Sequence, residues 1–156
     1  MSFTLLRPAS VEEASRMLLD HGDDARPIAG GTALQIFIHL GLLKVPYLID
    51  LAGVLGLDGV RIDGEWLAIG AMTPLAAVAR DPLVGEHLPA LADTYRRVAN
   101  PRVRTTATAG GNLCHGDYRL DPPAMLLPLG AELDLASAAH TRRLPLAEFF
   151  AGLEET

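Results

Sequence analysis

The sequence predicts an α+β domain made of two lobes, and three observations support this fold class. The 156 residues are 49% hydrophobic and 21% charged, which is the composition of a globular chain. Strand-like and helix-like segments alternate along the sequence. The composition changes near Val54–Asp58, so we expect one lobe over residues 1–54 and a second over residues 55–156. Each lobe contains one Gly-Gly pair.

The first lobe shows a clear helix start. Ser10 followed by Glu13 forms a capping box, apolar residues then recur at helical spacing, and Gly22 stands where the helix should end. The apolar segment Ala33–Leu40 predicts a buried helix that ends at Gly41. The expected strands of this lobe are Phe3–Leu6, Arg26–Ala29 and Tyr47–Leu51.

The second lobe begins with a hairpin signature, since two alternating segments flank Asp63-Gly64. Thr73 and Pro74 predict the start of a helix that Asp81-Pro82 ends. An apolar stripe over 88–99 predicts a helix that Asn100-Pro101 terminates. The remaining expected elements are hairpin strands Val60–Ile62 and Trp66–Ile69, a helix at Pro122–Leu129, a strand at Leu133–Ala136 and a mixed segment at Leu144–Phe150.

Charge and cysteine content exclude several classes of protein. The net charge of −6 and the lack of any Lys/Arg run argue against binding to nucleic acid. No apolar stretch is long enough to span a bilayer, and the first ten residues lack a signal-peptide pattern. The single cysteine, Cys114, allows neither an internal disulfide nor an iron–sulfur cluster held by this chain's thiolates alone. These features are typical of a cytoplasmic protein.

The two Gly-Gly pairs are the strongest candidates for a binding site. Backbone N–H groups in a glycine turn can form a nest for an anion, and Gly30-Gly31-Thr32 followed by an apolar helix has this form. Gly110-Gly111-Asn112 has it less clearly, with Thr108 adding a second polar side chain. Two such turns at one site would suit a diphosphate held from both lobes. The alternative is that each pair only permits a tight turn.

Known nucleotide fingerprints are absent, because the sequence contains neither the Walker A pattern nor G-x-G-x-x-G. Among other residues, Cys114 is expected to be a buried small hydrophobe and Trp66 to pack in the core. Arg102 and Arg104 precede the second pair, where they would either neutralise phosphate or serve a surface or salt-bridge role.

Two segments resemble the flavin-binding signatures of a known family. "PIAGGTALQI" and "RTTATAGGNLCHGDYRLDPPAMLLPLGAEL" are similar to segments in the FAD subunits of molybdenum hydroxylases. These are the medium subunits of carbon monoxide dehydrogenase-like enzymes and the FAD domain of xanthine dehydrogenase. "FTLLRPASVEEASRML", "LAIGAMTPLAAVARDP" and "LPLAEFFAGLEET" also resemble the family, so the similarity spans essentially the whole chain.

The resemblance implies a fold of the vanillyl-alcohol-oxidase (PCMH) type, in which two α+β lobes clasp an extended FAD. It assigns the pyrophosphate to a first loop and the pyrophosphate and ribityl chain to a second, with an aspartate toward the flavin end. The matching residues are Ala29, Gly30, Gly31, Thr32, Ala33 and Leu34 in the first loop, Thr108, Gly110, Gly111 and Asn112 in the second, and Asp121 as the aspartate. No catalytic residue and no metal ligand is expected in this chain.

The resemblance further implies an oxidoreductase component that is not active alone. Electrons would reach FAD from iron–sulfur clusters on one partner subunit of a complex that also contains a molybdopterin subunit, and would leave to NAD, a quinone or oxygen.

Three departures from the family pattern stand out. Arg104-Thr105 replaces the usual Arg-Asn, Gly116-Asp117-Tyr118 replaces Ala-Asp-Pro, and the usual C-terminal third domain is expected to be lacking. The alternative function is a truncated, flavin-free assembly module of such a complex.

Overall fold

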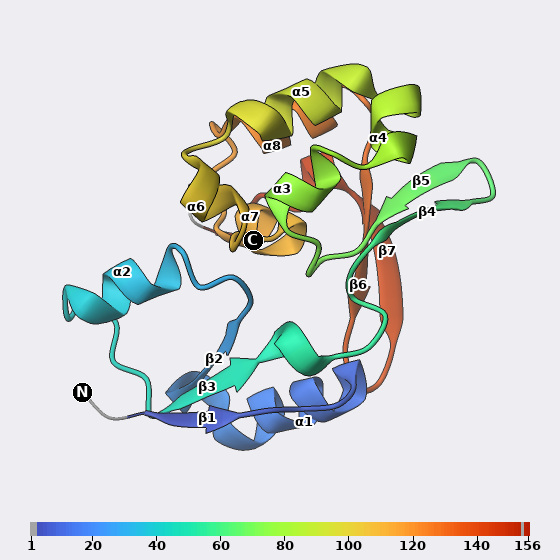
Figure 1. Cartoon of the computed structure of the whole chain (residues 1–156). Helices are drawn as coiled ribbons and strands as arrows, with labels where there is room; N and C mark the ends of the chain where they lie inside the picture. Colours follow the sequence, from blue (N-terminus) through green and yellow to red (C-terminus); the bar gives the residue numbers. More distant parts are fainter. Residues whose placement is uncertain (1–2, 154) are drawn as a thin grey trace.

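The computed structural model describes residues 3–153 and 155–156 and has a mixed α+β architecture with three small sheets (Figure 1). A three-stranded parallel sheet lies at one end of the molecule, and most of the helices lie at the other. The strands are β1 (Thr4–Leu6), β2 (Ala25–Ile28), β3 (Tyr47–Asp50), β4 (Val60–Asp63), β5 (Trp66–Ile69), β6 (Glu132–Ala136) and β7 (Thr141–Pro145). The helices are α1 (Val11–His21), α2 (Leu34–His39), α3 (Leu75–Val78), α4 (Pro82–His87), α5 (Pro89–Arg97), α6 (Pro101–Arg104), α7 (Ala109–Cys114) and α8 (Asp121–Leu126).

The parallel sheet has the order β1-β3-β2 and packs against α1. Ala14 of α1 meets Ala25 of β2 and Ile49 of β3 in a small buried core. The Ser10 hydroxyl accepts the Glu13 amide at 3.2 Å, as the capping box predicts. The Glu13 carboxylate, however, accepts the amide of Ala9 at 2.7 Å rather than that of Ser10. This core anchors the start of β2, the strand that the first Gly-Gly pair follows.

The prediction that the helix after the first Gly-Gly pair is buried is wrong. No residue of α2 is buried, and Ile36 is 57% exposed. The helix leaves β2 through the glycine loop and projects away from the sheet (Figure 1). Apolar composition indicates that a segment can be covered, but it does not indicate which elements lie near enough to cover it.

The helices of the second half form the largest core. Leu75, Val78, Val84, Leu91 and Tyr95 are fully buried there, and burial raises the pKa of Tyr95 to about 12. β4 and β5 form the antiparallel hairpin that the Asp63-Gly64 signature predicts. Side chains of this hairpin pack against the core.

Two helix boundaries differ from the prediction in this region. Thr73 does not cap a helix, because its hydroxyl donates to the Gly59 carbonyl at 3.1 Å. The helix α5, which carries the apolar stripe, ends at Arg97 rather than at Asn100. Ala99, just beyond it, adopts a left-handed backbone. Asn100 instead caps the next helix, α6, by accepting the Val103 amide.

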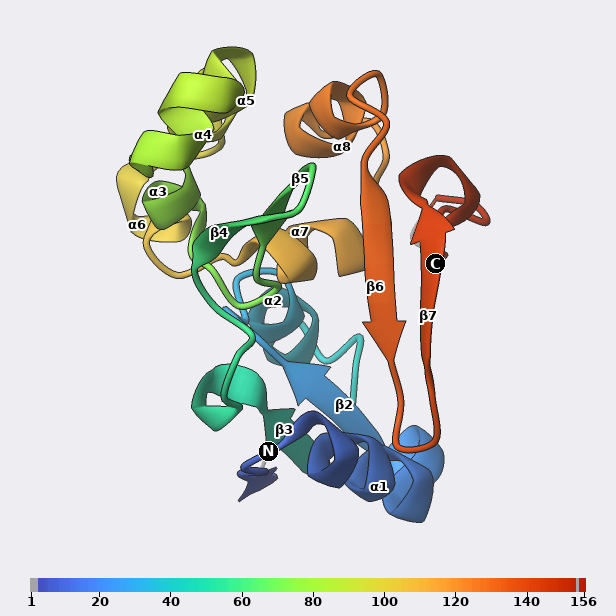
Figure 2. The same ribbon diagram turned by 90° about the vertical axis from the view of Figure 1, so that its right-hand side faces the viewer.

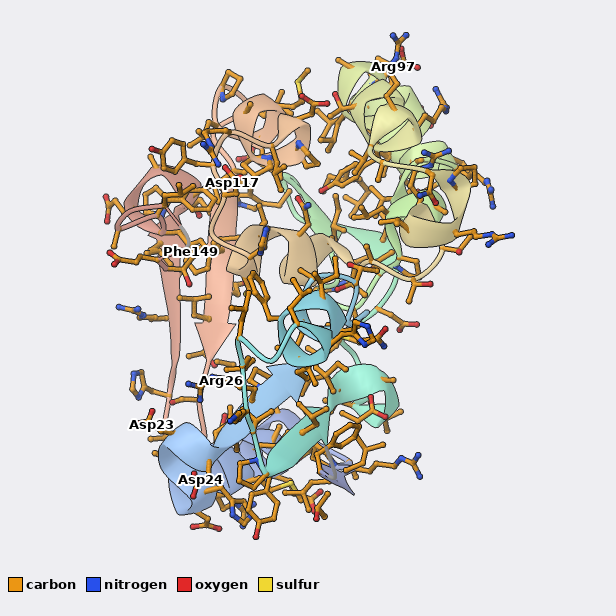
Figure 3. All side chains as sticks on the ribbon, turned by 90° about the vertical axis from the view of Figure 1, so that its left-hand side faces the viewer. Asp23, Asp24, Arg26, Arg97, Asp117 and Phe149 are labelled. Carbon is orange, nitrogen blue, oxygen red and sulfur yellow. The ribbon has the colours of Figure 1, made fainter. Side chains whose placement is uncertain are left out.

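The β6–β7 hairpin stands beside the β4–β5 hairpin and carries the third core (Figure 2). Leu146 and Phe149 pack there against Leu113 of α7, and Figure 3 shows Phe149 next to this hairpin. Trp66 is 46% exposed, contrary to the prediction that it lies in a core. The guanidinium carbon of Arg143 lies 5.9 Å from its ring centroid, so the tryptophan joins the two hairpins through a cation–π contact.

The capping motif of α1 gives a test of this fold. Ser10→Ala removes the acceptor for the Glu13 amide, so we expect the free energy of unfolding to fall by about 1 kcal/mol. Urea unfolding followed by circular dichroism measures this loss. Ser15→Ala, in the middle of the same helix, is the matched control and should change stability by less than about 0.5 kcal/mol. Equal effects of both substitutions would contradict the capping role.

Candidate cofactor-binding site

The first Gly-Gly loop presents a run of unused backbone donors. The loop follows β2 and leads into α2, and Gly31 has a φ of +68°, which glycine adopts without strain. Among the residues that the structure describes, no hydrogen bond is made by the five consecutive amides from Gly30 to Leu34. Successive free N–H groups in such a turn are suited to the oxygens of an anion.

The second Gly-Gly pair is not a turn, which corrects the prediction made from the sequence. Gly110 and Gly111 lie in the first turn of α7, and Thr108 caps this helix by accepting the Gly111 amide at 3.1 Å. The Gly110 amide donates to the Ala71 carbonyl at 2.8 Å. A Cβ on Gly110 would lie 2.9 Å from that same oxygen, so the helix packs this closely only with glycine there.

The two Gly-Gly segments meet in space although they are far apart in the sequence. A Cβ on Gly30 would overlap the carbonyl oxygen of Thr106 and lie 2.8 Å from the Ala107 Cα atom. A Cβ on Gly111 would lie 3.5 Å from the Ala29 Cβ atom. The loop after β2 therefore lies directly against the segment that leads into α7.

Ring contacts extend this junction. Phe37 of α2 and His115, at the end of α7, have ring centroids 6.4 Å apart. The helix after the first Gly-Gly pair thus approaches the C-terminal end of α7, the helix that contains the second pair.

Asn112 supplies an unsatisfied acceptor next to this junction. Its Oδ1 atom is buried and has no hydrogen-bond partner within the described part of the chain. Buried polar atoms in native proteins nearly always have partners. A polar ligand with hydroxyl donors could satisfy this acceptor.

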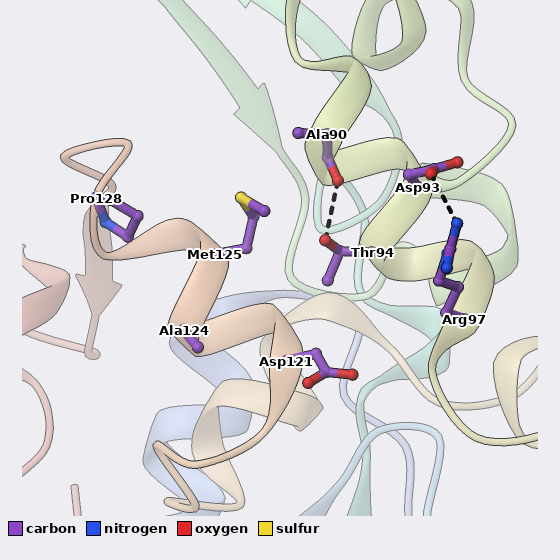
Figure 4. Close-up of a pocket in the computed structure, with 8 residues that line it drawn as sticks. All are labelled: Ala90, Asp93, Thr94, Arg97, Asp121, Ala124, Met125 and Pro128. Carbon is purple, nitrogen blue, oxygen red and sulfur yellow. Dashed lines mark hydrogen bonds and ion pairs between the residues drawn. The ribbon is translucent and has the colours of Figure 1, made fainter.

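Asp121 lies apart from this junction. It is the first residue of α8, is exposed, and its carboxylate points toward α5 (Figure 4). The groove it faces has a volume of about 510 Å³ and includes the ion pair of Asp93 with Arg97. None of the residues of the Gly-Gly segments is among those found to line this groove: Ala90, Asp93, Thr94, Arg97, Asp121, Ala124, Met125 and Pro128.

Asp117, in the segment where Gly116 and Tyr118 depart from the family pattern, forms a local ion pair with Arg119. Arg119 donates to both carboxylate oxygens of Asp117, at 2.8 and 2.9 Å. These hydrogen bonds lower the pKa of Asp117 from 3.8 to about 2. Figure 3 shows Asp117 on the same side of the molecule as Phe149.

Cys114 corrects another prediction, because the residue is exposed rather than buried. Partial covering of its sulfur nevertheless raises the pKa of the thiol.

Sequence reasoning missed the backbone that supports α7. The carbonyls of Ala71 and Thr73 accept the amides of Gly110 and Ala109 at 2.8 and 2.9 Å. Sequence reasoning also missed the contact of Thr106 with Gly30. These contacts are made by main-chain atoms, which every residue has, so residue types do not reveal them. Only the glycines, which allow the close approach, left a signal in the sequence.

The fold is that of an FAD-binding domain. The family model described as "FAD binding domain in molybdopterin dehydrogenase" matches residues 1–156, so the chain belongs to this family and FAD is its cofactor.

Relatives of known structure and sequence support the same assignment. The structure of carbon monoxide dehydrogenase from Hydrogenophaga pseudoflava that lacks the Mo-pyranopterin moiety superposes with a TM-score of 0.97 at 35% identity, covering 100% of this chain and 54% of that one. The alpha subunit of the 6-hydroxypseudooxynicotine dehydrogenase complex of Paenarthrobacter nicotinovorans is 35% identical over 147 residues, 94% of this chain and 50% of the relative. The carbon monoxide dehydrogenase medium chain of Afipia carboxidovorans is 34% identical over 151 residues, 97% of this chain and 52% of the relative.

The chain thus spans about half the length of the curated relatives it matches. Within the described part of the chain, no helix has both the length and the hydropathy that crossing a bilayer requires.

The contact at Gly30 yields a direct prediction. Gly30→Ala places a methyl group against the Thr106 carbonyl, so we expect the free energy of unfolding to fall by about 2 kcal/mol. Gly85→Ala is the control, because a Cβ there meets nothing within 4 Å and a helical alanine should stabilise by up to about 1 kcal/mol. Urea unfolding of both variants measures the difference. A Gly30→Ala protein as stable as wild type would show that the two segments do not touch.

The ion pair of Asp117 predicts a pH dependence. A depressed carboxyl pKa means that the stabilisation is present above the ordinary value of 3.8 and is lost as pH falls through about 2. Arg119→Ala should raise the pKa of Asp117 toward its ordinary value, which NMR titration of the carboxyl carbon measures. An unchanged pKa in this variant would mean that Arg119 is not the cause of the shift.

Proposed function

We propose that the chain is the flavin-carrying part of a molybdenum-containing dehydrogenase and holds FAD between its two Gly-Gly segments. The segments belong to the expected lobes 1–54 and 55–156, so the cofactor would be clasped from both sides. The observation that carries this proposal is the close approach of Gly30 to the Thr106–Ala107 peptide, which brings the loop with the free amides against the segment that leads into α7. That helix carries the unsatisfied Oδ1 atom of Asn112.

The first loop suits the pyrophosphate. Ala29, Gly30, Gly31 and Thr32 lead into Ala33 and Leu34, and the amides after Ala29 are unused donors. Backbone donors bind phosphate oxygens without a lysine, which suits a chain whose net charge is −6. The Thr32 hydroxyl would add a side-chain donor at the same place.

The second segment suits the pyrophosphate and the ribityl chain. The hydroxyl oxygen of Thr108 accepts a hydrogen bond from the Gly111 amide, so the role of Thr108 is to fix the start of α7. Gly110 and Gly111 keep the surface of the first turn free of side chains, and Asn112 offers its Oδ1 atom to a ligand hydroxyl. Asp121, whose exposed carboxylate begins α8, would face the flavin end.

The packing of α8 bears on the role proposed for Asp121, the first residue of that helix. α8 packs against both α7 and α5, and the Asp121 carboxylate lines the groove between α8 and α5. Among the described residues it accepts no hydrogen bond in the protein itself. An exposed acceptor of this kind suits a donor on the cofactor or on a covering segment.

Bound FAD would supply the ability to accept and release electrons one or two at a time. The protein's own residues would bind and orient it, and none is assigned a proton-transfer role. The family description, an FAD-binding domain in molybdopterin dehydrogenase, supports a molybdopterin-containing complex. Partner subunits would carry the iron–sulfur clusters and the molybdopterin, and NAD, a quinone or oxygen would be the external acceptor. We place this oxidoreductase complex in the cytoplasm.

The substitution Asn112→Leu tests the site through two opposite effects. Removing an unsatisfied buried acceptor should leave the FAD-free protein at least as stable as wild type. The same change should weaken FAD binding by at least about tenfold, because a cofactor hydroxyl loses its partner. Titration with FAD, followed by quenching of flavin fluorescence, measures the affinity. Cys114→Ala, an exposed neighbour on α7, is the control and should bind FAD like wild type.

Two results would contradict the proposal. If Asn112→Leu lowered stability and left FAD affinity unchanged, the amide would be structural and the site would lie elsewhere. If the wild-type chain bound no FAD, alone or with its partner subunits, the flavin-free assembly module would be the better account.

A further inference from the structure

The turn between α5 and α6 holds a strained residue. Ala99 has a φ of +46°, and it is the single non-glycine residue with positive φ in the described part of the chain. A side chain with a Cβ atom disfavours this conformation, so surrounding contacts must maintain it. The turn lies a few residues before the segment that touches the first glycine loop.

Arg104 supplies contacts that close this turn. One guanidinium nitrogen, Nη1, donates to the carbonyls of Val98 at 2.7 Å and of Ala99 at 3.0 Å. These carbonyls lie just beyond the last residue of α5, where a cation is also favoured by the helix dipole. Asn100 closes the other side by accepting the Val103 amide at 3.1 Å.

The segment after Arg104 transmits the orientation of α6 to the glycine loop. The hydroxyls of Thr105 and Thr106 donate to the Arg102 carbonyl at 2.8 and 3.3 Å, and the Ala107 amide donates to Val103 at 2.7 Å. These bonds leave the chain little freedom between α6 and Thr106. The Thr106 carbonyl then abuts Gly30, so the direction of α6 determines where the two segments meet.

We propose that Arg104 is a positioning residue for the cofactor site. Its guanidinium holds the Ala99 turn and so sets the orientation of α6. That orientation places the Thr106–Ala107 peptide against Gly30. This gives Arg104 a role different from both alternatives raised by its sequence position, phosphate neutralisation and a surface salt bridge. The consequence for affinity rests on the proposed function, whereas the effect on the loop does not.

A pair of substitutions separates positioning from direct contact. Arg104→Ala removes the clamp while Ala99 remains strained, so we expect FAD affinity to fall by about tenfold. Ala99→Gly adopts the same φ without strain and should bind FAD like wild type. In the double variant Ala99→Gly/Arg104→Ala, the turn no longer needs the clamp, and most of the lost affinity should return. Arg102→Ala, an exposed arginine on the same helix, is the control for loss of charge.

The second readout needs no cofactor. In the FAD-free protein, the backbone amide NMR signals of Gly30 and Gly31 should shift in Arg104→Ala, remain in place in Arg102→Ala, and return in the double variant. A general loss of stability would instead appear in the thermal midpoint without a selective change at these two glycines.

Three outcomes would overturn the proposal. In the first, Arg104→Ala leaves the glycine signals unchanged. In the second, its loss of FAD affinity is equal with and without the Ala99→Gly substitution, which is the result expected of direct contact with phosphate. In the third, Arg102→Ala reproduces the effect, which would assign it to charge alone. A wild-type chain without FAD affinity would refute the proposed function, while the glycine signals would still decide the role of Arg104.

Discussion

The close approach of Gly30 to the Thr106–Ala107 peptide is the constraint on which the site depends. It joins a loop that leaves the parallel sheet to a segment held by the helical core, and it tolerates no side chain. Everything that points into the site follows from this contact. The free amides follow one of the two touching backbones, and the buried oxygen of Asn112 lies on the helix that begins just after the other.

In the proposed site, the donors for an anion come from the backbone rather than from charged side chains. The chain has six more acidic than basic groups, counting Lys and Arg against Asp and Glu. Arg104, the arginine immediately before the second segment, donates hydrogen bonds from one guanidinium nitrogen to the carbonyls of Val98 and Ala99. Amide dipoles that are fixed by the fold can bind phosphate at low reorganisation cost, whereas a long side chain would first have to be ordered. Under the proposed function, such amides would let an acidic domain hold an anionic cofactor.

Much of the fold could be predicted from local signals, and the rest depended on contacts between distant segments. The Ser10 cap, the Asp63-Gly64 hairpin and the glycine loop after β2 rely on neighbours in sequence, and they appear where expected. The Gly-Gly pair in α7 was read as a turn because glycine usually breaks helices, whereas here it admits the Ala71 carbonyl. The exposure of α2 and Trp66 could not be predicted, since hydrophobicity does not identify the covering elements. The family motifs predicted the two segments of the candidate site, and the structure shows that they lie against each other.

The most direct test of the account is an amide NMR titration of the uniformly ¹⁵N-labelled chain with FAD. If the two segments form one site, the signals of Gly30 to Leu34 and those of Gly111 and Asn112 should move together and saturate with a single dissociation constant. Independent saturation of the two groups, or movement of only one of them, would contradict the claim that the cofactor is held jointly.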